Sequence, residues 1–134
     1  MKNYSEYIQK VTQKVLFERD RKILMMKDTN GNWELPGGTI DFGEEAETAL
    51  ARELKEEMGL NQDQYQVGEM VGKFNIMRHF PDKHYHFLAL VYKGELKVEN
   101  FKISNEHTEC GWFSMNNVIN LQMVEGYKEF FEKL

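Results

Sequence analysis

Cysteine is nearly absent from this 134-residue chain, and the one residue of that type, Cys110, cannot form an internal disulfide. A chain without disulfides is typical of a reducing compartment. No nucleophile motif surrounds Cys110, so we interpret it as a small buried residue beside a strand.

Met1 to Tyr7 lack the apolar core of a signal peptide, and no apolar run approaches membrane-spanning length. We therefore expect a cytoplasmic protein with no membrane partner.

Basic residues are also few, with 17 Lys and Arg against 22 Asp and Glu and a net charge of −5. Binding along a nucleic acid requires a basic surface that neutralises phosphates, so we expect no nucleic-acid partner. Hydrophobic residues at 41% and aromatic residues at 13% suit an ordinary globular protein. The length predicts one domain over residues 1–134, as a monomer or a homodimer.

The negative charge is concentrated in residues 44–57, where six glutamates face only two basic residues, a local charge of −4. In a helix turning by about 100° per residue, Glu53, Glu56 and Glu57 share one arc of about 100°. This arc adjoins the apolar stripe of the same helix instead of lying opposite to it. A solvated charged face would lie opposite the stripe and mix its signs. A solvated helix face therefore does not explain the position of these three glutamates.

Like charges placed this closely repel one another, and a divalent cation would relieve that repulsion. The segment contains neither histidine nor cysteine. Hard oxygen ligands without nitrogen or sulfur suit Mg²⁺, with Mn²⁺ as the alternative. A few residues before the segment, Gly37 and Gly38 permit a sharp bend that other residues resist. The pattern predicts a metal site at the bend and the helix.

The spacing of residues 38–60 resembles a known signature. Gly38, five residues, Glu44, seven residues and then Arg-Glu-Leu-Lys-Glu-Glu-Met-Gly-Leu match the Nudix box of the Nudix hydrolases at every fixed position. The signature constrains nine positions over 23 residues. The resemblance extends to Trp-Glu-Leu-Pro-Gly-Gly before the box and to Trp-Phe-Ser at residues 112–114. The chain is identified as a member of the Nudix family and is most similar to its MutT-like nucleoside triphosphate pyrophosphohydrolases.

The resemblance implies roles for individual residues. The metal ligands would be the three glutamates of the arc and the carbonyl of Gly38. Glu106 would complete the metal site or act as the general base, and Glu109 is the alternative candidate for this role. Both Glu53 and Glu106 are candidates to take the proton. Arg52 is expected to face away from the arc, pair with Glu44 and brace the loop and helix. The implied catalytic and metal-binding residues are Gly38, Glu44, Arg52, Glu53, Glu56, Glu57 and Glu106.

Candidate substrate residues lie outside the box. Arg78 and His79 could contribute cationic donors to a pyrophosphate, and Trp33 could stack on a base. The chain lacks the proline about 16 residues beyond the box that ADP-ribose-type members tend to carry, and the tyrosine that often marks dinucleoside polyphosphate members. We therefore expect a nucleoside triphosphate or an oxidised deoxynucleoside triphosphate to be cleaved to the monophosphate and pyrophosphate. The alternatives are an ADP-ribose, nucleotide-sugar or dinucleoside polyphosphate pyrophosphatase, and a non-catalytic regulatory module that binds nucleotides.

The order of elements predicts an α/β (α+β) fold, with a mixed sheet and helices on both faces. A bulge or bend is expected near Gly68 or Gly72, and Gly59 is expected to cap the box helix. The resemblance implies the α/β/α sandwich of the Nudix fold. Strands are predicted over residues 10–18, 22–27, 65–79, 84–93 and up to 114, and helices over 45–58 and 124–133.

Overall fold

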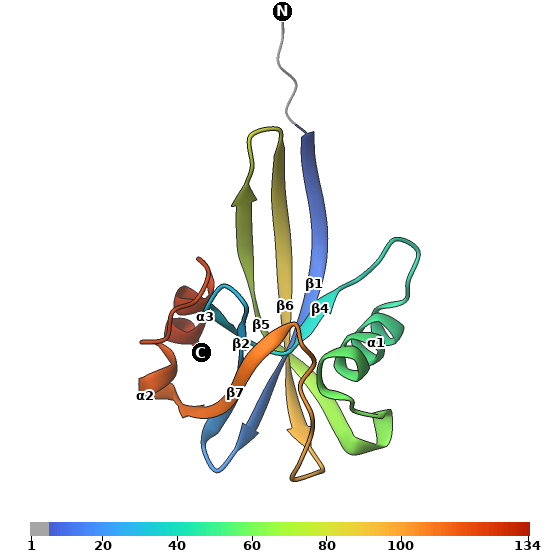
Figure 1. Cartoon of the computed structure of the whole chain (residues 1–134), viewed down its shortest axis with the longest axis vertical. Helices are drawn as coiled ribbons and strands as arrows, with labels where there is room; N and C mark the ends of the chain where they lie inside the picture. Colours follow the sequence, from blue (N-terminus) through green and yellow to red (C-terminus); the bar gives the residue numbers. More distant parts are fainter. Residues whose placement is uncertain (1–5) are drawn as a thin grey trace, which may run out of the picture.

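A computed structural model describes residues 6–134 (Figure 1). Residues 1–5, part of the segment predicted to lack a signal-peptide core, lie outside the described residues. In chain order the elements are β1 (Glu6–Arg19), β2 (Lys22–Asp28), β3 (Trp33–Glu34), β4 (Gly37–Thr39), α1 (Ala46–Met58), the 3-10 helix η1 (Gln62–Gln64), β5 (Tyr65–His79), β6 (Lys83–Leu96), β7 (His107–Ser114), α2 (Met115–Val118) and α3 (Tyr127–Lys133).

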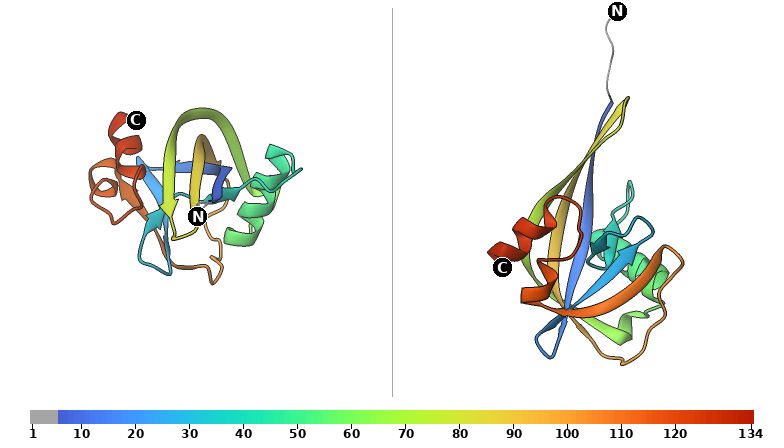
Figure 2. Two further views of the ribbon diagram at one scale, coloured as in Figure 1. Left: turned by 90° about the horizontal axis from the view of Figure 1, so that it is seen from above. Right: turned by 60° about the vertical axis from the view of Figure 1, so that its left-hand side comes forward.

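The strands form one mixed sheet in the order β3-β2-β1-β6-β5, with β4 paired to β1 and β7 paired to β2. Strand β1 is the axis of the sheet, because it runs parallel to β6 and antiparallel to β2 and β4. Its first part lies with β5 and β6 in a long three-stranded blade, and its last residues turn toward β2 (Figure 1). The sheet is therefore curled, as the second view confirms (Figure 2).

Helices cover both faces of the curled sheet, with α1 on one side and α2 and α3 on the other (Figures 1 and 2). Successive side chains of a strand point to opposite faces. Val15 and Phe17 of β1 accordingly pack in a core with Leu54 of α1. Leu16 packs in a second core with Tyr127 of α3. The predicted arrangement of a mixed sheet between helices is confirmed.

Local signals in the sequence placed several elements correctly. Helix α1 ends at Gly59, which has a φ of 66° and donates its N–H to the carbonyl oxygen of Lys55 at 3.0 Å. Strand β5 has the predicted bounds, and its pairing with β6 shifts register between Val67 and Met70 and again before Gly72. These shifts are the predicted bulge.

Two expectations are wrong. Helix α3 begins at Tyr127 instead of residue 124, because Gly126 before it has a φ of 106° and passes so close to the carbonyl of Asn75 that a Cβ would overlap it. Cys110 is exposed, and among residues 6–134 its strand β7 pairs only with β2 and so lies at an edge of the sheet. Within residues 6–134, none of the helices has both the length and the apolar character needed to cross a membrane.

Candidate active site

The glycine bend of β4 lies directly against the box helix. The backbone of Gly38 touches the carboxylate of Glu53, so that a Cβ at Gly38 would overlap the carboxyl group and lie 2.6 Å from Glu53 Cγ. Gly37, with a φ of 133°, donates its N–H to Oε1 of Glu57 at 2.8 Å. Gly37 therefore holds Glu57 by a hydrogen bond, and the missing side chain of Gly38 leaves room for the carboxylate of Glu53.

Arg52 joins four carboxylates of the box, and the longest-range partner in sequence is Asp41, 3.3 Å from its Nη2. Its Nε and Nη2 donate to the two oxygens of Glu44 at 2.8 and 2.9 Å. Its Nη1 lies 3.0 Å from Oε1 of Glu53 and 3.5 Å from Oε2 of Glu56. The predicted pairing with Glu44 is present, and the hydrogen bond lowers the pKa of that carboxyl to about 2. The expectation that Arg52 faces away from the arc is wrong, because its long side chain lies along the helix and its guanidinium reaches the arc carboxylates.

The three glutamates of the arc have different environments. The side chain of Glu56 is 55% exposed, that of Glu53 is 17% exposed and that of Glu57 is 4% exposed. Burial raises the pKa of Glu53. Burial also raises the pKa of Glu57, to about 7. Glu53 and Glu56 therefore form the accessible part of the arc, and Glu57 faces the interior.

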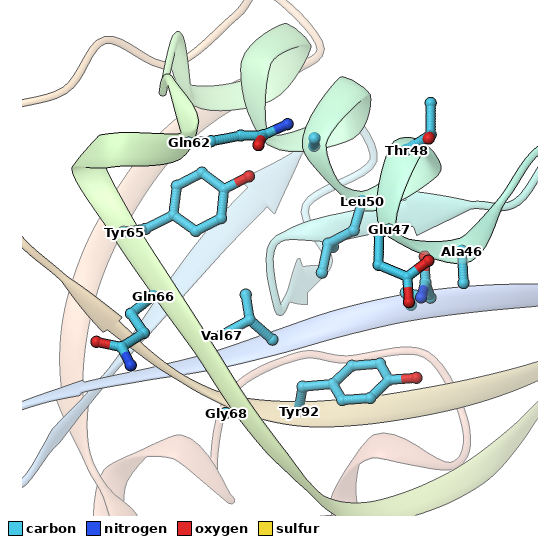
Figure 3. Close-up of a pocket in the computed structure, with 12 residues that line it drawn as sticks. Ala46, Glu47, Thr48, Leu50, Gln62, Tyr65, Gln66, Val67, Gly68 and Tyr92 are labelled. Carbon is cyan, nitrogen blue, oxygen red and sulfur yellow. The ribbon is translucent and has the colours of Figure 1, made fainter.

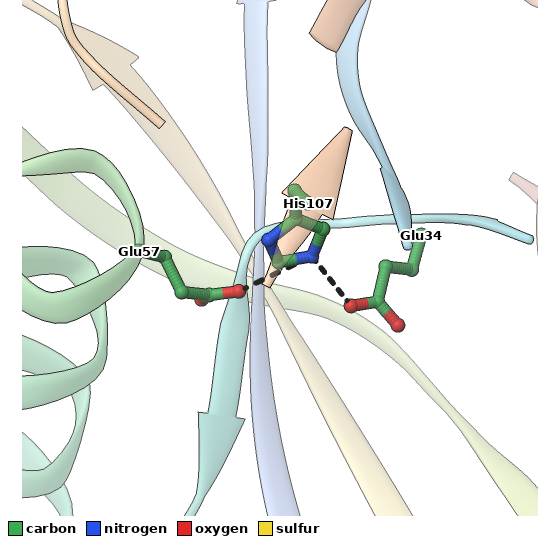
Figure 4. Close-up of side chains that lie close together, drawn as sticks. All are labelled: Glu34, Glu57 and His107. Atoms are coloured by element: carbon green, nitrogen blue, oxygen red, sulfur yellow. Dashed lines mark hydrogen bonds and ion pairs between the residues drawn. The ribbon is translucent and has the colours of Figure 1, made fainter. Parts of the chain in front are cut away.

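Glu57 faces a polar cluster whose other members the sequence did not reveal. Nε2 of His107 lies 2.9 Å from Oε1 of Glu34 and 3.7 Å from Oε2 of Glu57 (Figure 4). One ligand atom from each of these residues lies within 4.8 Å of the others. Lys14 of β1 is buried nearby. Burial disfavours its charge, but neighbouring acidic groups, Tyr127 and Glu34 foremost, raise its pKa above the usual value.

The charges in this cluster stabilise one another. Burial would raise the pKa of Glu34, but Lys14 and the hydrogen bond with His107 hold it below its usual value. Burial would lower the pKa of His107, but the hydrogen bond with Glu34 and the charge of Glu57 raise it. The cluster therefore favours a charged imidazolium and a charged ammonium beside the carboxylates.

A β-bulge explains why His107 was overlooked. Lys27 of β2 pairs with Glu109 and Asp28 pairs with His107, which leaves Thr108 as an extra residue in β7. Such a residue changes the direction of the neighbouring side chains. The available signal for Lys14 was the apolar run Val15 to Phe17 directly after it, because a run without alternating polar residues indicates a strand buried on both faces.

The structure does not connect Glu106 or Glu109 to the box. Glu106 is exposed, and within residues 6–134 its side chain makes no hydrogen bond or ion pair, although its backbone N–H contacts Ser104 Oγ at 3.4 Å. Glu109 pairs with Lys27 at 3.2 Å on the surface. Their roles at the metal stay predictions.

Of the three substrate candidates, only Arg78 approaches the box. It lines a cavity of about 160 Å³ together with Gly38, Lys14 and other residues of the sheet and of α3, and we name this space the box cavity. His79, the next residue, contacts His84 at 2.8 Å between their Nδ1 atoms. Trp33 packs edge-on against Phe113, with 4.9 Å between the ring centroids. The last two side chains therefore have structural neighbours that account for them.

Residues 10–134 match the model of the NUDIX domain. The chain is 31% identical over 110 residues to an ADP-ribose pyrophosphatase of Methanocaldococcus jannaschii, covering 79% of this chain and 62% of that protein. It is 32% identical over 114 residues to a MutT-like protein of Streptomyces ambofaciens, covering 84% and 67% of the two chains. A crystal structure of a MutT protein from Methanosarcina mazei Go1 has a TM-score of 0.73 and 26% identity, covering 96% of this chain and 93% of that one.

The chain therefore belongs to the NUDIX family. Its aligned part spans about three fifths of the archaeal ADP-ribose pyrophosphatase. Nudix hydrolases generally use divalent metals, and the residues present fit such an ion. Glu53 and Glu56 offer accessible carboxylate oxygens, and the Gly38 backbone touches Glu53. Hard oxygen donors of this kind suit Mg²⁺ or Mn²⁺.

Proposed function

We propose that this Nudix hydrolase cleaves a pyrophosphate bond in a nucleoside diphosphate linked to a further group. The observation that carries the proposal is the box cavity. Gly38 forms one part of its wall and touches Glu53, while the cations Lys14 and Arg78 form other parts. A polyphosphate needs cationic contacts for its oxygens and a place for a metal ion at the bond that breaks. Both features meet at this bend.

The residues that would hold the metal are Glu53, Glu56 and the carbonyl of Gly38, with Glu57 and Glu106 as further proposed ligands. Bound there, Mg²⁺ would stabilise charge on the phosphoryl oxygens and lower the pKa of the attacking water. We propose Mg²⁺ as the natural ion and Mn²⁺ as its substitute. Glu57 also supports the site from behind, because its carboxylate accepts the N–H of Gly37.

The protein's own side chains would orient the reactants. Arg52 holds Glu53 through a contact of 3.0 Å and fixes its carboxylate beside Gly38. Glu53 is the proposed general base, because its carboxylate lies against Gly38, which lines the box cavity. Lys14 and Arg78 would bind phosphate oxygens in the box cavity. Glu106 is the second candidate for the base and would have to move toward the box to act.

A nucleoside triphosphate, including an oxidised deoxynucleoside triphosphate, is the proposed substrate, with a monophosphate and pyrophosphate as products. The box cavity, at about 160 Å³, is smaller than the roughly 300–1,000 Å³ typical of sites that enclose a whole ligand. A cavity of this size suits a phosphate group better than the second sugar of ADP-ribose or of a nucleotide sugar. ADP-ribose is the second candidate, since a relative with 31% identity is named an ADP-ribose pyrophosphatase.

The test is a Mg²⁺-dependent hydrolysis screen with products identified by mass. The panel contains nucleoside triphosphates, oxidised deoxynucleoside triphosphates, ADP-ribose, nucleotide sugars and dinucleoside polyphosphates. Glu53→Gln should lower turnover by roughly 100-fold or more without loss of folding, as expected when one essential group is removed. Glu45→Gln is the matched control, because Glu45 precedes the same helix and its side chain makes no capping hydrogen bond.

Each result has a distinct meaning. If one triphosphate yields a monophosphate and pyrophosphate, the result supports the proposal and identifies the nucleobase that the enzyme recognises. A preference for ADP-ribose would support the assignment of the site but would contradict the proposal that a triphosphate is the substrate. Full activity of Glu53→Gln contradicts the assignment of the site. Nucleotide binding without turnover of any compound would favour a regulatory module.

A further inference from the structure

The face of the sheet that carries the box cavity continues past it along the blade. This three-stranded part of the sheet is formed by β1, β5 and β6 and projects beyond α1 and α3 (Figures 1 and 2). A cavity of about 600 Å³ lies on it near the turn between β5 and β6. We name it the blade groove, and its walls include Arg78, Phe80, Asp82, Lys83, Tyr85 and Phe87.

The blade groove adjoins the box cavity, because Arg78 and Phe87 line both spaces. Tyr85, the partner of Arg78 across the two strands, lines only the groove, and Gly38 lines only the box cavity. A molecule held at Gly38 can therefore extend past Arg78 into the groove. The other cavity of about 600 Å³, between α1 and the start of β5, shares no lining residue with the box cavity and so does not extend it (Figure 3).

The register of the strands gives the distance between the bend and the aromatic rings. Gly38 pairs with Gln13 of β1, and Gln13 pairs with Leu90 of β6. Phe87 and Tyr85 precede Leu90 by three and five residues, so at roughly 3.3 Å per residue they lie about 10 and 17 Å along the strand from the level of Gly38. This interval leaves room for the phosphates and the ribose of a nucleotide before its base.

The groove combines accessible aromatic rings with cations. The rings of Tyr85 and Phe87 are partly exposed and nearly parallel, with 11° between their planes and 5.9 Å between their centroids. Exposed Arg78 and Lys83 contribute two positive charges against one carboxylate, that of Asp82. Aromatic faces bind nucleobases by stacking, and cationic donors bind phosphate oxygens. The walls therefore suit a nucleotide better than an uncharged apolar molecule.

We propose that the base of the substrate stacks on Tyr85 in the blade groove while its phosphates occupy the box cavity, and that this contact makes the protein prefer purine nucleotides. The fused rings of a purine have a larger face than the single ring of a pyrimidine and therefore stack more strongly. The inference rests on the proposed hydrolysis and adds to it the position of the base and a residue that sets specificity.

The test measures binding by calorimetry in Mg²⁺, without any cleavage. The probes are the α,β-methylene analogues of GTP and CTP, in which the bond between the α and β phosphorus atoms cannot be hydrolysed, and inorganic tripolyphosphate, which has no base. The natural protein should bind the GTP analogue at least threefold more tightly than the CTP analogue. Tyr85→Ala should weaken the GTP analogue about tenfold or more, as expected for the loss of a base–aromatic stack, and tripolyphosphate less than twofold.

Two further variants separate stacking from other effects. Tyr85→Trp should keep the natural affinity for the GTP analogue within about threefold, because tryptophan also offers a flat ring. Tyr7→Ala is the matched control. Tyr7 is 77% exposed and stacks on His84, whose side chain points to the opposite face of the blade from Tyr85. This control should leave the affinity for both probes within twofold.

An NMR titration of the natural, ¹⁵N-labelled protein with the GTP analogue keeps the inference testable if Tyr85→Ala fails to fold. Saturable shifts should include the amides of residues 83–87, which end two of the walls of the groove. Tripolyphosphate should shift the amide of Gly38 and leave that of Tyr85 unchanged, because it reaches only the box cavity.

Several results would overturn the inference. These are unchanged affinity of Tyr85→Ala for the GTP analogue, equal weakening of the GTP analogue and tripolyphosphate, equal or tighter binding of the CTP analogue, and no shifts at residues 83–87. A change of oligomeric state in Tyr85→Ala without a loss of nucleotide affinity would assign this face to a second copy of the chain instead. An absence of turnover in the hydrolysis screen would contradict the proposed function alone, because the binding measurements need no cleavage.

Discussion

Two adjacent glycines enter the box, and replacing each by alanine should damage a different property. At Gly37, with a φ of 133°, a Cβ would overlap the carbonyl oxygen of Gln13 and lie 2.9 Å from Cα of Lys14. At Gly38 the Cβ would overlap the carboxyl end of Glu53, which belongs to a flexible side chain. Gly37→Ala should therefore lower stability, and Gly38→Ala should lower turnover.

The structure sets the size of each effect. For Gly37→Ala, backbone strain costs about 1–3 kcal/mol, and weakening the hydrogen bond to the Glu57 carboxylate adds about 1.5–3 kcal/mol. Together they amount to a loss of about 2.5–6 kcal/mol, which is a large share of the 5–15 kcal/mol typical of a folded domain. For Gly38→Ala, the backbone needs no unusual φ, so the stability loss should stay below about 1 kcal/mol. The carboxylate of Glu53 must move by about 1 Å, and a displacement of that size can cost on the order of 100-fold in rate.

Denaturant unfolding and Mg²⁺-dependent hydrolysis measure the two properties separately. Gly43→Ala is the control for backbone strain alone, because Gly43 has a φ of 79° and nothing lies within 4 Å of its Cβ position. It should cost about 1 kcal/mol and leave turnover unchanged. The reasoning is refuted if Gly38→Ala keeps full turnover, or if Gly37→Ala is no less stable than Gly43→Ala.

Three further predictions concern the charged groups. Arg52→Lys should lower turnover about 10- to 100-fold with a small loss of folding, because one ammonium cannot replace the paired contacts to Glu44; unchanged kinetics would contradict this. Lys14→Met should lower the free energy of unfolding by up to about 3–5 kcal/mol in denaturant titrations, since it removes one of the two buried cations beside Glu34 and Glu57 and leaves only His107. The pKa of Glu57 is raised from 4.5 to about 7, so its contribution to stability is fully present below pH 4.5 and is lost as the pH rises through 7. The unfolding free energy of metal-free protein should therefore fall between pH 5 and 7.5 by at most about 1.4 kcal/mol per pH unit from this group, and equal slopes for Glu57→Gln and the natural protein would contradict the assignment.

The sequence predicted those features whose causes are local. The period of the apolar residues and the glycine after them determine helix α1 and its end at Gly59, because both act within a few residues. The sandwich of a mixed sheet between helices also followed from the order of the elements. The pairing of Arg52 with Glu44 was predictable from the box, but the reach of Arg52 to Glu53 was not, since a helical wheel places the Cβ atoms and not the ends of long side chains.

The interior cluster could not be predicted, because its members come from four separate places in the chain. Lys14, Glu34, Glu57 and His107 share no sequence spacing, and only the curled sheet brings them together. The orientation of His107 depends in addition on the bulge at β7, which no local composition signals.

Glu57 shows why the arc contains three glutamates although only two of them are accessible. Its carboxylate accepts the N–H of Gly37 at 2.8 Å, and its backbone carbonyl accepts the N–H of Ser104 at 2.9 Å. One residue therefore connects the glycine bend, the helix and the loop before β7. Because Gly37 adjoins Gly38, displacing the Glu57 side chain would also displace the backbone that touches Glu53. The buried glutamate thus positions the accessible part of the site, so removal of its side chain should affect folding and turnover together, whereas removal of the exposed Glu56 side chain should affect turnover alone.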